Sequence, residues 1–277
     1  MISGKTTLIA HVGYPTETFK APMIYNPWFE SKGIDAFVVP MGVKPEDFPT
    51  AIQTLRKMTN LRGALVTMPH KVSVMELVDE LTPTARIAGA CNALLLTAEG
   101  RLVGDQFDGA GFVRGVLAKG FKLEGKRVLV SGNGGVGCAI AASLAAAGVA
   151  EMALFDAREE SSKALAQRLV HHYPELIVTT GSNDPKGYDL IVNGTPLGMK
   201  ADDPLPFDME RVDPGTFVGE VVMKTAITPL LAAAQAKGCP IQMGTDMLFE
   251  MIPAYLEFFG FGTATADELR AVAQIRY

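Results

Sequence analysis

The chain has 277 residues, with 30 acidic and 25 basic side chains and a formal net charge of −5. Because acids and bases are interspersed and nearly balanced, a nucleic-acid-binding surface and a basic membrane patch are excluded, and a small molecule is the expected partner. No stretch reaches the roughly eighteen uninterrupted apolar residues of a membrane span and no signal-peptide pattern is present, which predicts a cytoplasmic protein.

Strands and helices alternate along the first part of the chain, which predicts an open, mainly parallel α/β sheet. Apolar runs indicate the strands, and proline after a loop is typical of the first turn of a helix. A turn at Glu99–Gly100 joins the last two strands. The predicted strands are residues 6–13, 34–40, 63–68, 91–96 and 101–104, and the predicted helices are residues 22–32, 45–58, 70–81 and 83–87.

A polar, glycine-containing crossing at residues 105–112 separates this part from the next, so the fold class is α/β with two domains. We place the first domain at residues 1–105 and the second at 106–245, with the helices of residues 246–277 returning to the first. The predicted strands of the second domain are residues 126–130, 151–155, 177–179, 189–193, 216–219 and 240–242. The remaining predicted helices are residues 111–118, 139–147, 159–169, 228–236, 246–259 and 265–275.

The three cysteines lie far apart in apolar or alanine-rich surroundings, at Cys91, Cys138 and Cys239. They are expected to be small buried residues in a reducing compartment, rather than a disulfide framework. No cluster has metal-ligand spacing, so no metal is expected. Oligomeric state is open between monomer and homodimer.

A glycine-rich loop stands between an apolar strand and an alanine-rich helix, and Gly132, Gly134 and Gly137 have the G-x-G-x-x-G spacing. In a dinucleotide-binding unit these glycines allow a tight turn, backbone approach to a pyrophosphate and close packing of helix on strand. A surface glycine loop is the alternative, and the flanking elements favour the dinucleotide site. The predicted cofactor-binding residues of the loop are Gly132, Asn133, Gly134, Gly135, Val136 and Gly137.

Asp156 closes the next predicted strand, 24 residues beyond Gly132. This is near the expected separation of about 20 residues at which a carboxylate binds the adenosine ribose. Such a carboxylate repels a 2′-phosphate and favours NAD, whereas Arg158 is able to reach round and bind that phosphate. Capping of the following helix is the alternative role of Asp156. NAD or NADP is therefore expected, with NAD slightly favoured.

Lys71 follows a buried strand, and the carboxyl end of a strand is where an open α/β sheet places its ligands. Asp108 lies at the crossing between the domains. A lysine and a carboxylate beside a nicotinamide suit alcohol oxidation, because the ammonium orients the hydroxyl and the pair relays its proton. A surface lysine and a turn-forming aspartate are the alternatives, and spacing alone leaves the choice open. His70 is interpreted as the residue that happens to precede the lysine.

Seven motifs along the chain resemble those of shikimate dehydrogenases and occur in the same order. They cover almost the whole sequence, so the chain is identified as a member of that family. The motifs are VTMPHK (66–71), GACNAL (89–94), GDQFDGAGF (104–112), the glycine-rich loop, NGTPLGM (193–199), TPLL (228–231) and GTDML (244–248).

The resemblance implies an oxidoreductase with an N-terminal substrate domain and a C-terminal Rossmann domain. It implies a catalytic pair of Lys71 and Asp108, with Thr67 and Asn92 beside the substrate. The residues that it places near the nicotinamide or elsewhere on the cofactor are Asn193, Thr195, Pro196, Met199 and Gly244.

Several positions depart from the family pattern, and nearly all replace a polar contact by an apolar side chain. Phe19 and Ala21 stand where the family has two serines that bind the substrate carboxylate. The other departures are Leu65 for an asparagine, Gln106–Phe107 for an asparagine–threonine pair, Met223 for a tyrosine and Met251 for a glutamine. Phe19, Ala21, Met223 and Met251 are therefore predicted to line an altered substrate pocket.

Each lost bond to a charged carboxylate costs about 1.5–3 kcal/mol, so two lost serines predict an affinity for shikimate lower by about a hundredfold or more. We therefore expect NAD(P)-dependent turnover of a related cyclic alcohol or ketone, with weak activity on shikimate. Lys20 is either a compensating charge or a solvated loop lysine, the latter being favoured. Quinate dehydrogenase activity, or a regulatory cofactor-binding protein without efficient turnover, are the alternatives.

Overall fold

The computed structural model describes residues 2–200 and 202–276, and the chain divides into two compact units. Unit 1 holds the described residues up to Phe107 together with Met251–Arg276, and unit 2 holds Asp108–Glu250. The chain therefore passes from one unit to the other twice, the second time within a helix. No helix in the described part of the chain is long and apolar enough to cross a membrane.

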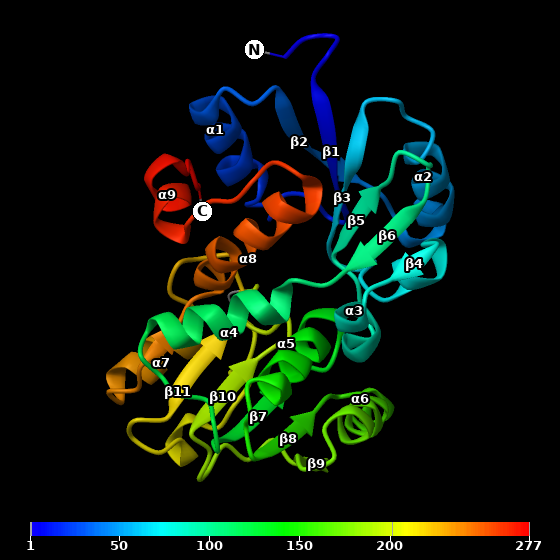
Figure 1. Cartoon of the computed structure of the whole chain (residues 1–277). Helices are drawn as coiled ribbons and strands as arrows, with labels where there is room; N and C mark the ends of the chain where they lie inside the picture. Colours follow the sequence, from blue (N-terminus) through cyan, green and yellow to red (C-terminus); the bar gives the residue numbers. More distant parts are fainter. Residues whose placement is uncertain (1, 201, 277) are drawn as a thin grey trace. The chain divides into compact units, whose positions relative to one another are not determined.

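Unit 1 is built on a six-stranded sheet of order β2-β1-β3-β5-β6-β4 (Figure 1). β1, β2 and β3 are parallel, β5 is antiparallel to β3 and β6, and β4 is parallel to β6. The strands are β1 Thr7–Gly13, β2 Ala36–Gly42, β3 Leu61–Val66, β4 Glu80–Leu81, β5 Ala93–Leu96 and β6 Leu102–Asp105. The helices are α1 Pro22–Lys32, α2 Phe48–Leu55, α3 Pro83–Ala88 and α9 Ala266–Val272, with short 3-10 helices at Pro45–Asp47 and Ser73–Leu77.

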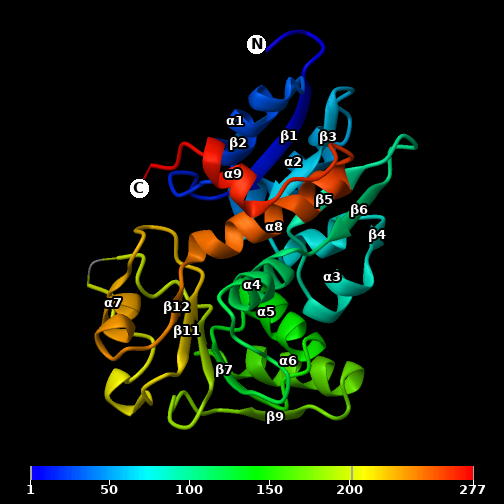
Figure 2. The same ribbon diagram turned by 60° about the vertical axis from the view of Figure 1, so that its left-hand side comes forward.

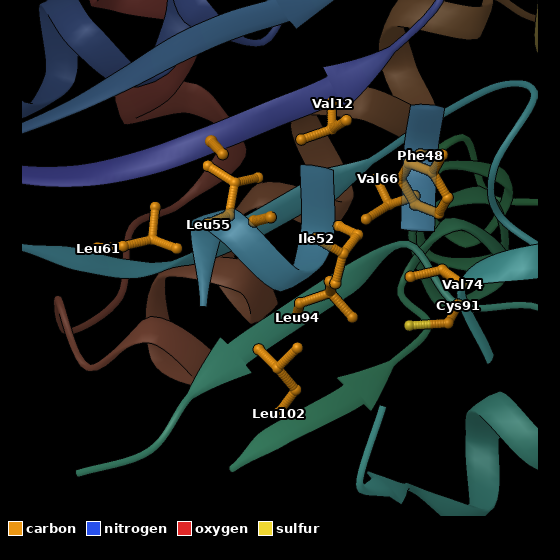
Figure 3. Packing of buried hydrophobic residues seen from close by; sticks show 12 residues of the cluster. Val12, Phe48, Ile52, Leu55, Leu61, Val66, Val74, Cys91, Leu94 and Leu102 are labelled. Carbon is orange, nitrogen blue, oxygen red and sulfur yellow. The ribbon is translucent and has the colours of Figure 1, made fainter. Parts of the chain in front are cut away.

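Side chains alternate across the sheet of unit 1, which gives it two different faces. Ala10 and Val12 pack with Phe48 and Ile52 of α2 in one apolar core (Figure 3). His11, between them, therefore points to the other face, where parallel register places Leu65 beside it. Large aromatic residues of α1 and of the last part of α8 (Gly244–Phe259) pack together in unit 1, namely Tyr25, Phe29, Tyr255 and Phe259.

Unit 2 contains a six-stranded parallel sheet of order β12-β11-β10-β7-β8-β9 (Figure 2). The strands are β7 Arg127–Ser131, β8 Glu151–Phe155, β9 Ile177–Thr180, β10 Leu190–Asn193, β11 Phe217–Glu220 and β12 Ile241–Gln242. The helices are α4 Asp108–Ala118, α5 Gly135–Ala146, α6 Glu159–His172, α7 Pro229–Ala236 and the first part of α8, with a 3-10 helix at Met209–Arg211. This is the doubly wound order in which dinucleotides bind at the carboxyl ends of the strands.

α4 and α5 lie side by side within unit 2 (Figure 1). A Cβ atom added to Gly109 would lie 2.0 Å from the carbonyl oxygen of Ala139, so glycine is needed for this close approach. The prediction of a polar crossing over residues 105–112 is therefore wrong in part. The helix already begins at Asp108, where a carboxylate in the first turn interacts favourably with the helix dipole.

The predicted helix over residues 70–81 is also wrong. The chain forms a 3-10 helix at Ser73–Leu77 and then β4, which pairs with β6. The Asp79 carboxylate accepts the N–H of Leu102 at 2.7 Å, and Asp79 N–H donates to the Leu102 carbonyl at 2.9 Å. These contacts with a later hairpin satisfy backbone groups that a helix would otherwise pair locally.

Candidate functional site

The carboxyl ends of β1 and β3 lie side by side in unit 1 and carry the first group of predicted residues. Thr67 follows β3, and its N–H donates to the Val12 carbonyl at 2.9 Å. A Cβ atom added to Gly13 would lie 2.4 Å from Cγ2 of Thr67 and 2.9 Å from Cζ of Phe19. Phe19 and Thr67 therefore both lie against the Cβ position of Gly13, at the end of the sheet from which the segment with Lys71 departs.

Phe19 stacks on His11, with ring centroids 4.1 Å apart and an angle of 25° between the planes. His11 is buried, and its Nδ1 has no hydrogen-bond partner among the described residues. Burial, helped by the positive charge of Lys71, lowers the pKa of His11 to about 3. The imidazole is therefore neutral near pH 7. Sequence reasoning missed His11, although a polar residue inside an apolar strand was a usable signal.

Lys20 and Ala21 are both buried, beside the start of α1. The Nζ of Lys20 donates a hydrogen bond to the backbone carbonyl of Arg276, also in unit 1. The interpretation of Lys20 as a solvated loop lysine is therefore wrong. The sequence pattern did not connect Arg276 with this loop.

Asn92 lies just before β5, is 1% exposed, and is held by contacts from distant parts of unit 1. Its Oδ1 accepts the N–H of Phe107 at 3.0 Å, and its backbone carbonyl accepts the hydroxyl of Tyr255 at 3.1 Å. Its Nδ2 is buried and has no hydrogen-bond partner in the described structure. The amide is thus fixed in place with a donor still to be satisfied, as expected for a residue that binds a polar substrate.

Tyr255 also packs edge-on against Phe107, with ring centroids 4.8 Å apart. Sequence reasoning did not identify Tyr255, because a tyrosine in the apolar stripe of a helix is normally a core residue. Met251, one turn earlier in α8, is partly exposed.

His70 has a structural role. Its Nε2 lies 2.7 Å from the Val43 carbonyl, and its ring stacks on Phe48 at a centroid distance of 3.8 Å. Burial lowers its pKa, and the bond to Val43 partly offsets the effect. His70 thus fixes the start of the segment that carries Lys71 against α2.

Lys71 belongs to unit 1 and is partly exposed, whereas Asp108 is the first residue of α4 in unit 2 and is 1% exposed. The alternative of a loop aspartate is wrong, since Asp108 is helical. The pairing of the two side chains across the units stays a prediction.

The glycine-rich loop of unit 2 has the geometry of a pyrophosphate site. Gly132 has φ +88°, and a Cβ atom on Gly137 would lie 1.7 Å from the Gly132 carbonyl oxygen. At Gly134 an added Cβ would meet no atom within 4 Å, and no side chain caps the start of α5 there. The N-terminus of α5 is therefore open to an anion, and these residues fit a dinucleotide. Gly135 and Val136 begin α5 and are partly exposed.

Asp156 connects the end of β8 with this loop. Its Oδ2 accepts the N–H of Asn133 at 2.7 Å, and its Oδ1 accepts the N–H of Arg158 at 2.9 Å. The alternative that Asp156 caps α6 is wrong, because Arg158 occupies the N-cap position. The Arg158 side chain is 77% exposed, with Nε 3.8 Å from Asp156 Oδ1.

The loop after β10 is organised by Asn193, which is fully buried. Its Oδ1 accepts the N–H and the hydroxyl of Thr195 at 3.1 and 2.6 Å, and its Nδ2 donates to the Leu197 carbonyl at 3.0 Å. Thr195 and Met199 are partly exposed and Pro196 is exposed. The loop therefore presents backbone and small side chains at the carboxyl edge of the sheet.

Two further predicted residues follow β11 and β12 at this edge. Gly244 begins α8 in close packing, since an added Cβ would lie 2.5 Å from the Val222 carbonyl oxygen. Met223 is partly exposed. The Asp203 carboxylate, which sequence reasoning missed, accepts the N–H groups of Gly198 and Lys200, both at 2.9 Å. It closes the far end of the Asn193 loop.

Comparison with known proteins agrees with this architecture. Residues 12–94 match a family model described as the shikimate dehydrogenase substrate binding domain. A shikimate dehydrogenase (NADP(+)) from Acidiphilium cryptum is 36% identical over 276 residues, which is 99% of this chain and 98% of that protein.

Two solved structures are similar along the whole chain. The shikimate 5-dehydrogenase of Thermus thermophilus, in complex with NADP(H) and shikimate, has a TM-score of 0.86 and 25% identity, covering 97% of this chain and 99% of that one. The ligand-free 5-ketofructose reductase of a Gluconobacter strain has a TM-score of 0.84 and 25% identity, covering 98% of each chain. With 36% identity to a relative over almost its full length and a matching family model, the chain belongs to the shikimate dehydrogenase family of NAD(P)-dependent oxidoreductases.

Proposed function

We propose that the protein interconverts a ring hydroxyl and a ketone on a shikimate-like cyclic substrate, with weak activity on shikimate itself. The observation that carries this proposal is the stack of Phe19 on neutral His11, at the position where the family has a carboxylate-binding serine. Neither ring supplies a positive charge to an anion. Unit 1 is the proposed substrate domain, and unit 2 the proposed nucleotide domain.

The proposed chemistry retains the groups that handle the reacting hydroxyl. Lys71 orients the hydroxyl and stabilises developing negative charge, and Asp108 shares the proton relay with it. Asn92 supports a substrate contact, because its fixed side chain has a buried donor without a partner. NAD(P), when bound, accepts or supplies the hydride.

The loss of two hydroxyl donors to a carboxylate favours a less polar or differently substituted ring. Two missing hydrogen bonds to a carboxylate, at about 1.5–3 kcal/mol each, correspond to a hundredfold or greater loss of affinity. The structural neighbour named for reduction of 5-ketofructose, an uncharged ketone, supports this direction. Quinate is the nearest alternative substrate, since a solved neighbour is named a quinate dehydrogenase.

A cofactor-reduction screen over shikimate, quinate and uncharged cyclic polyols tests the proposal. We expect the wild type to prefer an uncharged ring and to show poor kcat/KM for shikimate. The double variant Phe19→Ser/Ala21→Ser should gain at least about tenfold in kcat/KM for shikimate, since it restores two hydroxyl donors. Lys71→Ala should lose about 10²–10⁴-fold in kcat on every substrate while still binding the cofactor.

Other outcomes have definite meanings. A wild-type kcat/KM for shikimate within the range of about 10⁴–10⁸ M⁻¹s⁻¹ of efficient enzymes contradicts the altered pocket. Quinate as the best substrate favours the quinate dehydrogenase alternative. Cofactor binding without turnover of any substrate favours a regulatory protein.

For the cofactor we propose a slight preference for NAD over NADP. The partly buried Asp156 carboxylate lies at the end of β8, where it accepts ribose hydroxyls and repels a 2′-phosphate. The exposed Arg158 acts in the opposite direction, so the preference is small. We expect NAD⁺ to bind at most about tenfold more tightly than NADP⁺, and Asp156→Asn to reverse the order. Tighter binding of NADP⁺ by the wild type in calorimetry contradicts this preference.

A further inference from the structure

Glu220 is a buried carboxyl group that none of the roles above explains. It is the last residue of β11 and is fully buried. Neither Oε1 nor Oε2 has a partner at normal hydrogen-bonding geometry in the described part of the chain. Because an unsatisfied buried carboxyl group is costly, its presence needs a functional explanation.

The position of Glu220 in the sheet connects it with the cofactor. Parallel register places Glu220 level with Asn193 at the end of β10, and Asn193 level with Ser131 at the end of β7. The strand order changes direction between β7 and β10, which is where a dinucleotide crosses the sheet. Asp156 marks the adenosine side, beyond β7, so the nicotinamide half lies toward β10 and β11.

Two polar, uncharged side chains lie beside Glu220. Asn193, at the end of β10, holds its own loop, and Thr228, the N-cap of α7, accepts the N–H of Leu231 at 3.3 Å, which leaves its hydroxyl hydrogen available to Glu220. Gln242 of β12 stands level with Gly219, so it points to the opposite face of the sheet from Glu220, where it donates to the Phe112 carbonyl at 3.1 Å. No charged side chain among the described residues offsets the desolvation of Glu220.

Burial raises the pKa of Glu220 to about 7, and Thr228 and Asn193 offset part of the increase. The neutral and ionised forms are therefore close to balance at neutral pH. A positive charge placed nearby would shift that balance toward the carboxylate.

We propose that Glu220 provides the negative charge that favours the oxidised, positively charged nicotinamide over the reduced, neutral ring. Binding of oxidised cofactor ionises the carboxyl group, and its proton is released to solvent. Reduced cofactor leaves the proton in place. This role rests on the proposed binding of NAD(P) to unit 2.

The test compares dissociation constants of NADP⁺ and NADPH for the full chain at about pH 6 and about pH 8. The 2′-phosphate titrates in both ligands and cancels in their ratio. In the wild type, Kd(NADP⁺)/Kd(NADPH) should fall about tenfold with increasing pH, as the carboxylate forms. In Glu220→Gln the ratio should not change with pH, and at the higher pH NADP⁺ alone should bind about tenfold more weakly.

A second readout is proton release, measured by calorimetry in two buffers with different heats of ionisation near pH 7. On binding NADP⁺ the wild type should release a fraction of a proton per molecule of protein, and on binding NADPH it should not. Glu220→Gln should abolish this difference. Glu210→Gln is the matched control, because it removes an exposed carboxyl group from the same unit and should behave as the wild type.

The outcomes separate the two proposals. If Glu220→Gln binds both cofactors with the wild-type ratio, pH dependence and proton release, Glu220 is only structural and the inference is overturned. If the folded wild type binds neither nicotinamide cofactor, nucleotide binding itself fails and this inference fails with it.

Discussion

His11 and Phe19 are two residues whose roles depend on each other. A serine to phenylalanine change alone would place an apolar ring at this end of the sheet, but here the ring also covers an imidazole that burial keeps neutral. We propose that this pair replaces an anion-binding position of the family by an aromatic surface. A single substitution at Phe19 is therefore expected to expose His11 as well as to restore a hydroxyl.

The low pKa of His11 predicts acid sensitivity of the fold. Between about pH 6.5 and pH 3 the unfolded chain binds a proton at His11 that the folded chain does not, so stability falls as pH decreases. At about pH 5 this linkage amounts to about 2 kcal/mol. We expect the unfolding free energy of both proteins, measured by urea denaturation, to fall when the pH is lowered from 7 to 5. The fall should be about 2 kcal/mol smaller in His11→Leu than in the wild type.

His172→Gln is the control for this measurement, because it removes an exposed histidine at the end of α6. It should retain the pH dependence of the wild type. Identical pH dependence in His11→Leu would show that the folded protein protonates His11 without cost, which contradicts a low pKa caused by burial.

At the scale of an element, the strand–loop–helix segment from β7 to α5 contains glycines that are present for two different reasons. Gly137 is required by packing, since its Cβ position overlaps the Gly132 carbonyl oxygen. Gly134 has φ −79° and open space around its Cβ position, so the folded chain alone does not require glycine there. We propose that glycine is used there to let a ligand approach the backbone closely.

Alanine substitutions should distinguish these uses. Gly137→Ala should cost at least about 2 kcal/mol of unfolding free energy, because the loop backbone must shift. Gly134→Ala should leave stability within about 0.5 kcal/mol. It should nevertheless weaken cofactor binding about tenfold or more, because a methyl group occupies the approach of the pyrophosphate. Chemical denaturation and calorimetry measure the two effects. Unchanged cofactor affinity in Gly134→Ala would place the pyrophosphate elsewhere.

At the scale of the whole molecule, chain connectivity assigns distant segments to one unit. The end of α8 and α9 belong to unit 1, and Tyr255 brings that segment into contact with Asn92. The sequence contained an apolar stripe in these helices, which predicted packing on the first domain. It contained no indication of the individual partner, because a stripe specifies a buried face and not the residue opposite it.

Two local predictions from the sequence were wrong for a related physical reason. The helix expected over residues 70–81 was replaced by a 3-10 turn and β4 because Asp79 and Leu102 pair across the sheet. Lys20 was expected to be solvated, and its Nζ instead donates a hydrogen bond to the carbonyl of Arg276. In each case a residue distant in sequence supplies the hydrogen bond, which local propensity does not register.

The sequence by itself determined the α/β class, the glycine-rich loop and family membership, because these depend on local periodicity, glycine spacing and ordered motifs. The altered substrate pocket stays a prediction. Only the tertiary structure brought His11 under Phe19, fixed Asn92 through Phe107 and Tyr255, and buried the carboxyl group of Glu220. Burial and hydrogen-bond satisfaction depend on which chain segments meet in space, and no local pattern specifies that.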